Sequence, residues 1–225
     1  MISVIFDLDG TLVDSEPNYY ESGRRTLERH GVHGFTWEQH SRFIGIGTLE
    51  TLEILKDRYG IPAPVEQLLA EQNAAYLELA RGGTEVFPQM RKFVERLFAE
   101  GVPMAVASGS SREAIEAVLA GTGLDALLTT AVSAEEVAHG KPAPDVFLEA
   151  ARRLGVRPAD CVVVEDAAPG ARAAHAAGMA CVAVPYAEAA AGDPGFATAE
   201  LVFPSGQPEF SAEAAYAWLS ARRAA

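Results

Sequence analysis

The chain has 225 residues, 49% of them hydrophobic and 22% charged, which are the proportions of a globular protein that can bury a real core. Its length allows one large domain or a domain with an insertion. The formal net charge of −13 argues against nucleic acid or an anionic membrane as a partner. Neither a basic-then-apolar leader nor an apolar run of about 18 residues is present, so we expect a cytoplasmic protein that is not secreted and does not span a membrane.

The first expected element is a strand over residues 4–6, because an uninterrupted apolar run is typical of a parallel strand covered on both faces. Asp7 and Asp9 follow it, and Gly10 permits a sharp exit from the sheet. Ligands of open α/β sheets bind at the carboxyl ends of strands, so chemistry is expected here. Two carboxylates about 4 Å apart repel by roughly 4 kcal/mol at an effective dielectric of about 20, which a hard cation such as Mg²⁺ would offset. The alternative interpretation is an acidic turn after an edge strand.

A helical block is predicted over residues 15–82. Ser15 can cap its first helix, and Thr36 and Gln39 have capping-box spacing ahead of a second. No strand pattern interrupts the block. The four expected helices cover about residues 16–30, 37 onward, 49–59 and 65–79.

From residue 83 onward, helices and short apolar strands alternate, which indicates a parallel sheet wrapped by helices. The expected helices are 88–100, 112–119, 144–154, 170–177 and 212–221, and the expected strands are 104–107, 127–132, 161–164, 181–184 and 201–203. The fold class is therefore α/β, with a Rossmann-like core of residues 1–14 and 83–225 and the helical domain 15–82 inserted after the first strand. Cys161 and Cys181 lie in strand-like runs, so we expect buried free thiols.

Polar residues follow a second strand, the one expected over residues 104–107. A small hydroxyl followed by glycine and a helix start can bind an anion, which makes Ser108 a candidate for contact with a phosphate. Ser110 has capping-box spacing to Glu113, so helix capping is favoured there over substrate contact.

Two later strands end in charged residues. Lys141 stands between Gly140 and Pro142 in a stiff turn, where it could neutralise carboxylates and hold a phosphate; the alternative is an ordinary solvated lysine. Glu165 and Asp166 directly follow the strand expected over 161–164 and repeat the pattern of the first strand. Buried acids at such a point are costly unless they bind a ligand or lie in water.

The order and spacing of these four motifs resemble the haloacid dehalogenase-like superfamily of phosphotransferases. The resemblance covers essentially the whole chain and rests on Asp7-Leu8-Asp9-Gly10-Thr11, Ser108-Gly109-Ser110, Gly140-Lys141-Pro142 and Val164-Glu165-Asp166. Residues 13–17 and 140–145 look like the subgroup that contains β-phosphoglucomutases and small sugar-phosphate phosphatases.

The resemblance implies different roles for the acids. Asp7 would be the nucleophile that forms an aspartyl-phosphate, and Asp9 would be the acid that protonates the leaving oxygen and then the base for water. Mg²⁺ would be held by the carboxylates of Asp7 and Asp166 and by the carbonyl of Asp9, with Glu165 ordering a metal-bound water.

For the substrate, the resemblance implies that Ser108, the N–H of Gly109 and Lys141 hold the phosphoryl oxygens. The helical domain would be a cap that closes over the site and contacts the leaving group. We expect a small phosphorylated metabolite, most simply a sugar phosphate, and a monomeric enzyme. The candidates for leaving-group contacts in the cap are Ser15, Tyr19, Gly45 and Thr48.

Three alternatives to a phosphatase fit parts of this pattern. A dehalogenase lacks an acid at the position of Asp9, because a halide needs no proton. A mutase of the β-phosphoglucomutase type needs cap groups for a second phosphate, but by an approximate ungapped alignment its histidine, arginine and lysine fall on Tyr19, Thr48 and Gln72. A non-catalytic receiver-like domain has no helical insertion after its first strand. The sequence therefore favours a phosphatase, with the mutase as the nearer alternative.

Overall fold

The structure, a computed structural model, describes residues 2–44, 46–186 and 192–224. It divides into two compact units: Met1–Asp14 with Glu85–Ala225, and Ser15–Thr84. We describe each unit by itself. Within the described residues, no helix is both long and apolar enough to cross a bilayer.

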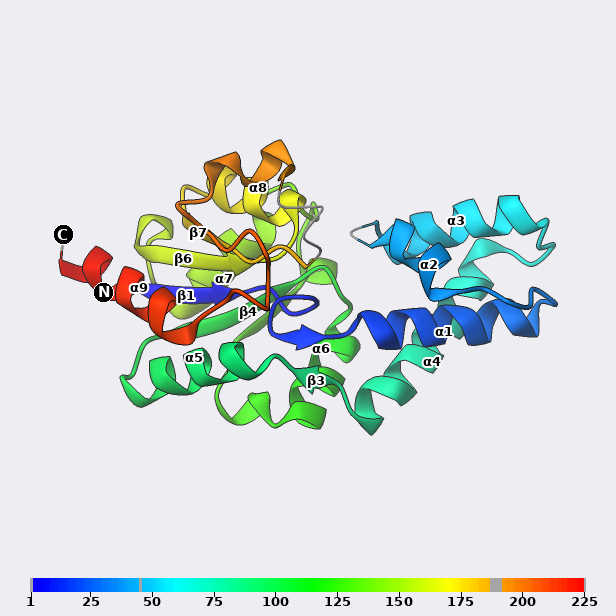
Figure 1. Ribbon diagram of the computed structural model, residues 1–225, viewed down its shortest axis with the longest axis horizontal. Coiled ribbons are helices and arrows are strands. Elements are labelled where there is room, and N and C mark those ends of the chain that lie inside the picture. Colours follow the sequence, from blue (N-terminus) through cyan, green and yellow to red (C-terminus); the bar gives the residue numbers. More distant parts are fainter. Residues whose placement is uncertain (1, 45, 187–191, 225) are drawn as a thin grey trace. The chain divides into compact units, whose positions relative to one another are not determined.

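The first unit is built on a six-stranded sheet in the order β5-β4-β1-β6-β7-β8, in which every neighbouring pair is parallel. Figure 1 shows β1 in the middle of this sheet, between β4 and β6. The predicted α/β fold class is confirmed. The strands are β1 Ser3–Phe6, β4 Met104–Ser108, β5 Ala131–Ser133, β6 Cys161–Glu165, β7 Ala180–Ala183 and β8 Leu201–Val202.

Helices cover both faces of the sheet, as a parallel sheet requires. They are α5 Pro88–Ala99, α6 Arg112–Thr122, α7 Asp145–Leu154, α8 Ala168–Ala176 and α9 Ala212–Ala224. Ile5 packs into a cluster with residues of α7 and α8. The next residue, Phe6, points to the opposite face, where its ring lies 6.0 Å from that of Phe93 in α5. Cys161 and Cys181 are buried free thiols, as expected.

Three local predictions were wrong. The strand expected over 127–132 is only Ala131–Ser133, because the chain first forms a short 3₁₀ turn at Leu124–Ala126 and then buries Leu128 from a loop. The helix expected from Gly170 begins two residues earlier, at Ala168. The helix after β4 begins at Arg112 and is capped by Ser111, whose side chain accepts from the N–H of Ala114, so Ser110 is not the cap.

A second, two-stranded sheet was not predicted. β2 Val13–Asp14 pairs antiparallel with β3 Glu85–Val86, so the chain leaving the first unit lies beside the chain returning to it. Two-residue strands carry too little hydrophobic pattern to be detected from sequence.

The second unit is helical throughout its regular structure. It comprises α1 Glu16–Arg29, α2 Trp37–His40, a 3₁₀ turn at Ser41–Phe43, α3 Thr48–Tyr59 and α4 Val65–Gly82. The predicted capping box of Thr36 and Gln39 is present. Ser15 occupies the N-cap position of α1, but its side chain makes no capping hydrogen bond, so that prediction was wrong. One buried hydrophobic cluster of the unit comprises Leu27, Phe35, Phe43, Leu52, Leu55, Ile61 and Leu68.

Candidate active site

Lys141 joins the ends of two neighbouring strands. Its Nζ donates to Asp7 Oδ1, after β1, at 2.6 Å and to Glu165 Oε2, at the end of β6, at 2.8 Å. The ammonium also lies 4.9 Å from the centre of the Phe147 ring, which is fully buried. Asp7 and Glu165 are almost completely buried as well. The Lys141 side chain, 13% exposed, is therefore a largely buried charge partner, and its alternative interpretation as an ordinary solvated lysine was wrong.

Asp166 completes an acidic cluster with Asp7 and Glu165. One carboxylate oxygen from each lies within 4.8 Å of the others, an arrangement that could hold a metal ion. Thr11 Oγ1 donates to Asp166 Oδ1 at 3.1 Å, and the N–H of Ala167 donates to Glu165 Oε1 at 3.3 Å. The three acids come from the adjacent strands β1 and β6, whose registers place Phe6 beside Val164.

The cluster brings three carboxyl groups close to one lysine, which supplies too little positive charge to balance them. Burial, followed by the nearby charge of Glu165, raises the pKa of Asp7 to about 8 despite Lys141. Burial and then the charge of Asp7 raise the pKa of Asp166 well above its ordinary value. Burial alone would lower the pKa of Lys141, but the carboxylates of Asp7 and Glu165 outweigh it and raise that pKa. A divalent cation would relieve this crowding, and carboxylate oxygens are the donors that Mg²⁺ prefers.

Asp9 accepts hydrogen bonds from the neighbouring strand β4 and the loop that follows it. Its Oδ2 accepts from Ser110 Oγ at 2.7 Å and from Ser108 Oγ at 3.3 Å; Ser108 ends β4 and Ser110 lies two residues after it. Two acids one residue apart therefore occupy different surroundings, one beside a lysine and one beside two hydroxyls. Gly109, between those serines, is exposed, which leaves its backbone accessible.

Two glycines make room for the acids. A Cβ on Gly10, whose φ is +78°, would lie 2.3 Å from Asp166 Oδ2, and a Cβ on Gly170 would lie 2.0 Å from the carboxyl carbon of Glu165. The close approach at Gly170 could not be found from the sequence, where this residue looks like a simple helix start.

Gly170→Ala tests how closely Glu165 approaches this glycine, because the substitution has two opposing effects on the stability of the protein. Helix propensity alone would stabilise the protein by up to about 1 kcal/mol, whereas a forced shift of Glu165 costs about 1 to 3 kcal/mol. We expect a net loss in the free energy of unfolding, measured by chemical denaturation. Gly82→Ala, at the end of α4 with open space around it, is the matched control and should not be destabilising. A Gly170→Ala protein as stable as this control would contradict the tight approach.

Two residues from the last fifth of the chain contact the loop after β1 and the strand β2 that follows it, and these contacts were not foreseen. Gln207 Nε2 donates to the carbonyls of Gly10 and Thr11 at 3.3 and 3.0 Å. Tyr186 Oη donates to Asp14 Oδ1 at 2.9 Å. No local pattern in the sequence signals contacts across more than 170 residues.

The residues expected to line the cap belong to the second unit. Ser15 is fully buried, and its hydroxyl has no hydrogen-bond partner among the residues that the structure describes. The Tyr19 ring stacks on that of Tyr76 at 4.3 Å, and Thr48 is the half-buried first residue of α3. Gly45 lies outside the described residues. A role for these residues in substrate binding stays a prediction.

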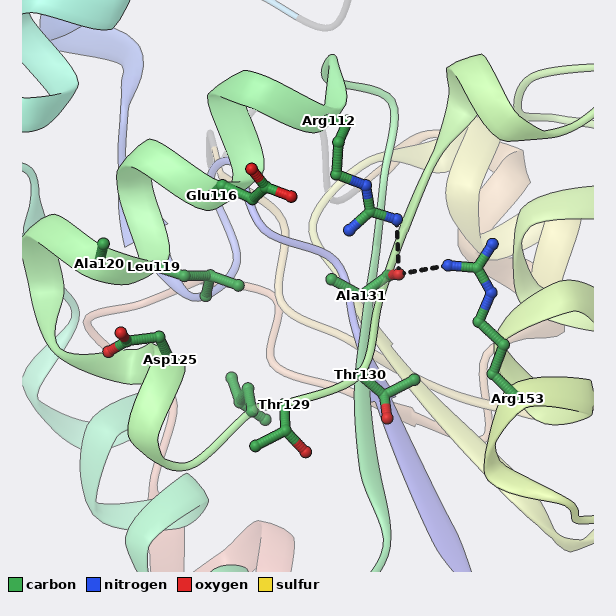
Figure 2. Close-up of a pocket in the computed structure, with 10 residues that line it drawn as sticks. Arg112, Glu116, Leu119, Ala120, Asp125, Thr129, Thr130, Ala131 and Arg153 are labelled. Atoms are coloured by element: carbon green, nitrogen blue, oxygen red, sulfur yellow. Dashed lines mark hydrogen bonds between the residues drawn. The ribbon is translucent and has the colours of Figure 1, made fainter.

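A hollow of about 710 Å³ beside the edge strand β5 is separate from the acidic cluster, none of whose residues lines it. Figure 2 shows Arg112 and Arg153 pointing at the same carbonyl, that of Ala131, to which they donate at 2.8 and 2.7 Å. Both also form salt bridges with Glu136, so each guanidinium group already has an acidic partner. These side chains cover a carbonyl of the exposed sheet edge, which opposes pairing with another strand.

A parallel sheet with acids at its carboxyl edge is typical of α/β proteins that bind a ligand there, and comparisons with known proteins specify the class. A sequence profile described as haloacid dehalogenase-like hydrolase matches residues 3–178. The chain belongs to the haloacid dehalogenase-like hydrolase family, which confirms the resemblance found in the sequence.

Three similar proteins illustrate the family. Fructose-1-phosphate phosphatase YqaB of Escherichia coli is 35% identical over 80% of this chain and 95% of that protein. The bifunctional riboflavin kinase/FMN phosphatase of Arabidopsis thaliana is 34% identical over 81% of this chain, which spans about half, 48%, of that longer protein. The crystal structure of CbbY from Rhodobacter sphaeroides in complex with phosphate has a TM-score of 0.78 at 26% identity, covering 91% of this chain and 95% of that one.

Proposed function

We propose that the protein is a Mg²⁺-dependent phosphatase that hydrolyses a small phosphorylated metabolite, most simply a sugar phosphate, through an aspartyl-phosphate on Asp7. The observation that carries the proposal is the contact of Lys141 with Asp7 and Glu165 in a buried site that also contains Asp166. Family membership and relatives named as phosphatases of fructose 1-phosphate and FMN support the same reaction class.

The described residues fit a hard divalent cation. Asp7 and Asp166 would hold the ion with carboxylate oxygens and Asp9 with its backbone carbonyl, and Glu165 would contribute through a water. The raised pKa values of Asp7 and Asp166 support this assignment, because they mark negative charge that the protein alone does not balance. When bound, Mg²⁺ supplies positive charge that stabilises the phosphoryl oxygens and keeps the carboxylates ionised.

Asp7 attacks the phosphorus atom as the bond from phosphorus to the leaving oxygen breaks, which leaves the phosphoryl group on the Asp7 carboxylate. Asp9 gives its proton to the leaving oxygen, and the resulting carboxylate later takes a proton from the water that hydrolyses the intermediate. The different surroundings of the two acids support this division of work. Lys141 holds the orientation of the Asp7 carboxylate, since it donates to its Oδ1.

Ser108, the Gly109 N–H and Lys141 bind the phosphoryl oxygens in this scheme. Ser108 ends β4 and Lys141 reaches Asp7, so both lie at the carboxyl edge where the phosphoryl group must sit. Donors fixed in advance of the reaction stabilise the charge that develops during transfer. We also propose that residues 15–82 act as the cap, with Ser15, Tyr19, Gly45 and Thr48 as candidates for leaving-group contacts.

Hydrolysis is preferred over a mutase reaction because the second unit offers little charge where a mutase would hold its second phosphate. Tyr19 is stacked on Tyr76, and Gln72 is buried with its amide 3.6 Å from the Cβ position of Gly23. Both are uncharged and take part in packing. Water is therefore preferred over a second sugar phosphate position as the acceptor of the phosphoryl group.

We expect purified protein with Mg²⁺ to release inorganic phosphate from members of a metabolite panel that includes fructose 1-phosphate, other sugar phosphates, FMN and p-nitrophenyl phosphate. Chelation with EDTA should abolish release, and added Mg²⁺ should restore it. No release from any member would overturn the proposed activity. With β-glucose 1-phosphate, formation of glucose 6-phosphate in place of free phosphate would establish the mutase instead.

A further inference from the structure

The two serines whose hydroxyls contact Asp9 differ in their other roles, because only Ser108 is also proposed to bind the phosphoryl group. Ser108 lies 3.3 Å from Asp9 Oδ2 and is almost completely buried at the end of β4, where the proposed phosphate site lies. Ser110 makes the shorter bond, 2.7 Å, to the same oxygen. A phosphoryl group that engages Ser108 would leave Ser110 to hold Asp9.

Ser110 is itself fixed by the neighbouring strand. Ser133 at the end of β5 is fully buried, and its Oγ donates to the Ser110 carbonyl at 2.7 Å. The Ser110 N–H donates to Ser108 Oγ at 3.0 Å. The sheet register places Ser133 directly beside Ser108, so the loop that carries Ser110 is held from two adjacent strands.

Helix capping does not account for Ser110. The cap of α6 is Ser111, which accepts from the N–H of Ala114 at 3.2 Å. The Ser110 hydroxyl is directed instead at an acid 101 residues away in sequence. A hydrogen bond donated to one carboxyl oxygen restricts the rotamers of the acid.

We propose that Ser110, supported by Ser133, is a positioning residue that holds Asp9 in the orientation from which it protonates the leaving oxygen. The inference rests on the proposed role of Asp9. Proton transfer from the Asp9 carboxyl to the leaving oxygen accompanies cleavage of the bond between that oxygen and phosphorus, so a misplaced Asp9 slows this step. A p-nitrophenolate leaving group needs no proton, and an alkoxide does.

The test compares kcat/KM for two substrates, because this ratio reports the steps up to loss of the leaving group. The substrates are p-nitrophenyl phosphate and fructose 1-phosphate, or whichever alkyl phosphate of the panel is hydrolysed fastest. Ser110→Ala should lose about 10- to 100-fold on the alkyl phosphate, a part of what a general acid contributes, and less than about 3-fold on the aryl phosphate. Ser110→Thr keeps the hydroxyl and should recover most of the loss, whereas Ser110→Val, of nearly the same shape, should not.

Two controls separate the possible failures. Ser111→Ala removes the helix cap and should lower stability without changing the ratio between the two substrates. Asp9→Asn should show the same substrate selectivity as Ser110→Ala, and more strongly.

Equal loss on both substrates in Ser110→Ala, or no loss, overturns the inference when Asp9→Asn is selective. If Asp9→Asn is itself unselective, the acid role of Asp9 in the proposed function fails as well. If Ser110→Ala does not fold, the Thr and Val pair decides the same question.

Discussion

Asp7→Asn is expected to reduce phosphate release by about 10⁴-fold or more, because an amide cannot form the acyl-phosphate on which the proposed route depends. The fold should survive, since Asn has the same shape and can still accept a hydrogen bond from Lys141. The loss is measured as initial rates of phosphate release from the best substrate of the panel, with circular dichroism and thermal unfolding recorded on the same samples.

Asp57→Asn is the matched control for this change. It makes the same chemical substitution at an exposed acid in α3, and it should leave the rate unchanged. An Asp7→Asn protein that keeps more than a small fraction of the activity, after the Asn has been verified by mass spectrometry, would remove Asp7 as the nucleophile. The family assignment would stand, because it does not depend on this role.

Asp166→Asn is expected to separate stability from metal binding. It removes one of three crowded carboxylates while the Asn oxygen can still accept from Thr11, so the metal-free protein should gain about 1 kcal/mol or more in the free energy of unfolding. The same change removes a proposed Mg²⁺ ligand. The stabilisation that the wild-type protein gains from Mg²⁺ should therefore be lost or strongly reduced, as measured by thermal unfolding with and without Mg²⁺.

The raised pKa values also predict how the stability of the metal-free protein changes with pH. The folded state raises the pKa of Asp7 from 3.8 to about 8 and raises that of Asp166 as well. Folding therefore favours the protonated carboxyls, and this stability is fully present below the unfolded pKa of about 4 and is lost as pH rises toward 8. The metal-free protein should weaken across that window, and Mg²⁺, which binds the ionised acids, should stabilise it more at the upper end.

The control for Asp166→Asn is Asp125→Asn, at an exposed acid of the same unit, which should preserve both the pH dependence and the response to Mg²⁺. A wild-type protein whose unfolding midpoint does not move with Mg²⁺ at any pH would contradict the proposed metal site. An Asp166→Asn protein less stable than wild type without metal would contradict the electrostatic account of the cluster.

Most strands of the sheet could be predicted from local hydrophobic patterns in the sequence. Val4, Ile5 and Phe6 form an apolar run that is typical of a strand covered on both faces, and β1 includes all three. The acids after β1 and β6 and the lysine after β5 are likewise visible in the sequence. Parallel strands bring their carboxyl ends to one edge, so the pattern also implied that Asp7, Lys141 and Glu165 would meet, and the structure brings them into contact.

Where local signals competed, the sequence was ambiguous. Ser110 and Ser111 both precede α6 and both can cap a helix, and only the tertiary structure directs Ser110 to Asp9 and leaves the cap to Ser111. The strand over 127–132 was overextended because buried loop residues such as Leu128 look like strand residues. Hydrophobicity reports burial, and burial alone does not distinguish a strand from a loop packed on the core.

The sequence by itself determined the family, the α/β sheet and the acids and lysine at its carboxyl edge, since residue types and short spacings encode these. Only the tertiary structure decided how the acids divide their partners, with Asp7 beside Lys141 and Asp9 beside two serines. It also decided that Gly170 must leave space for Glu165 and that Gln207 holds the loop after β1. These contacts join residues far apart in the chain, and their energies depend on distances of a few tenths of an ångström, which no local pattern carries.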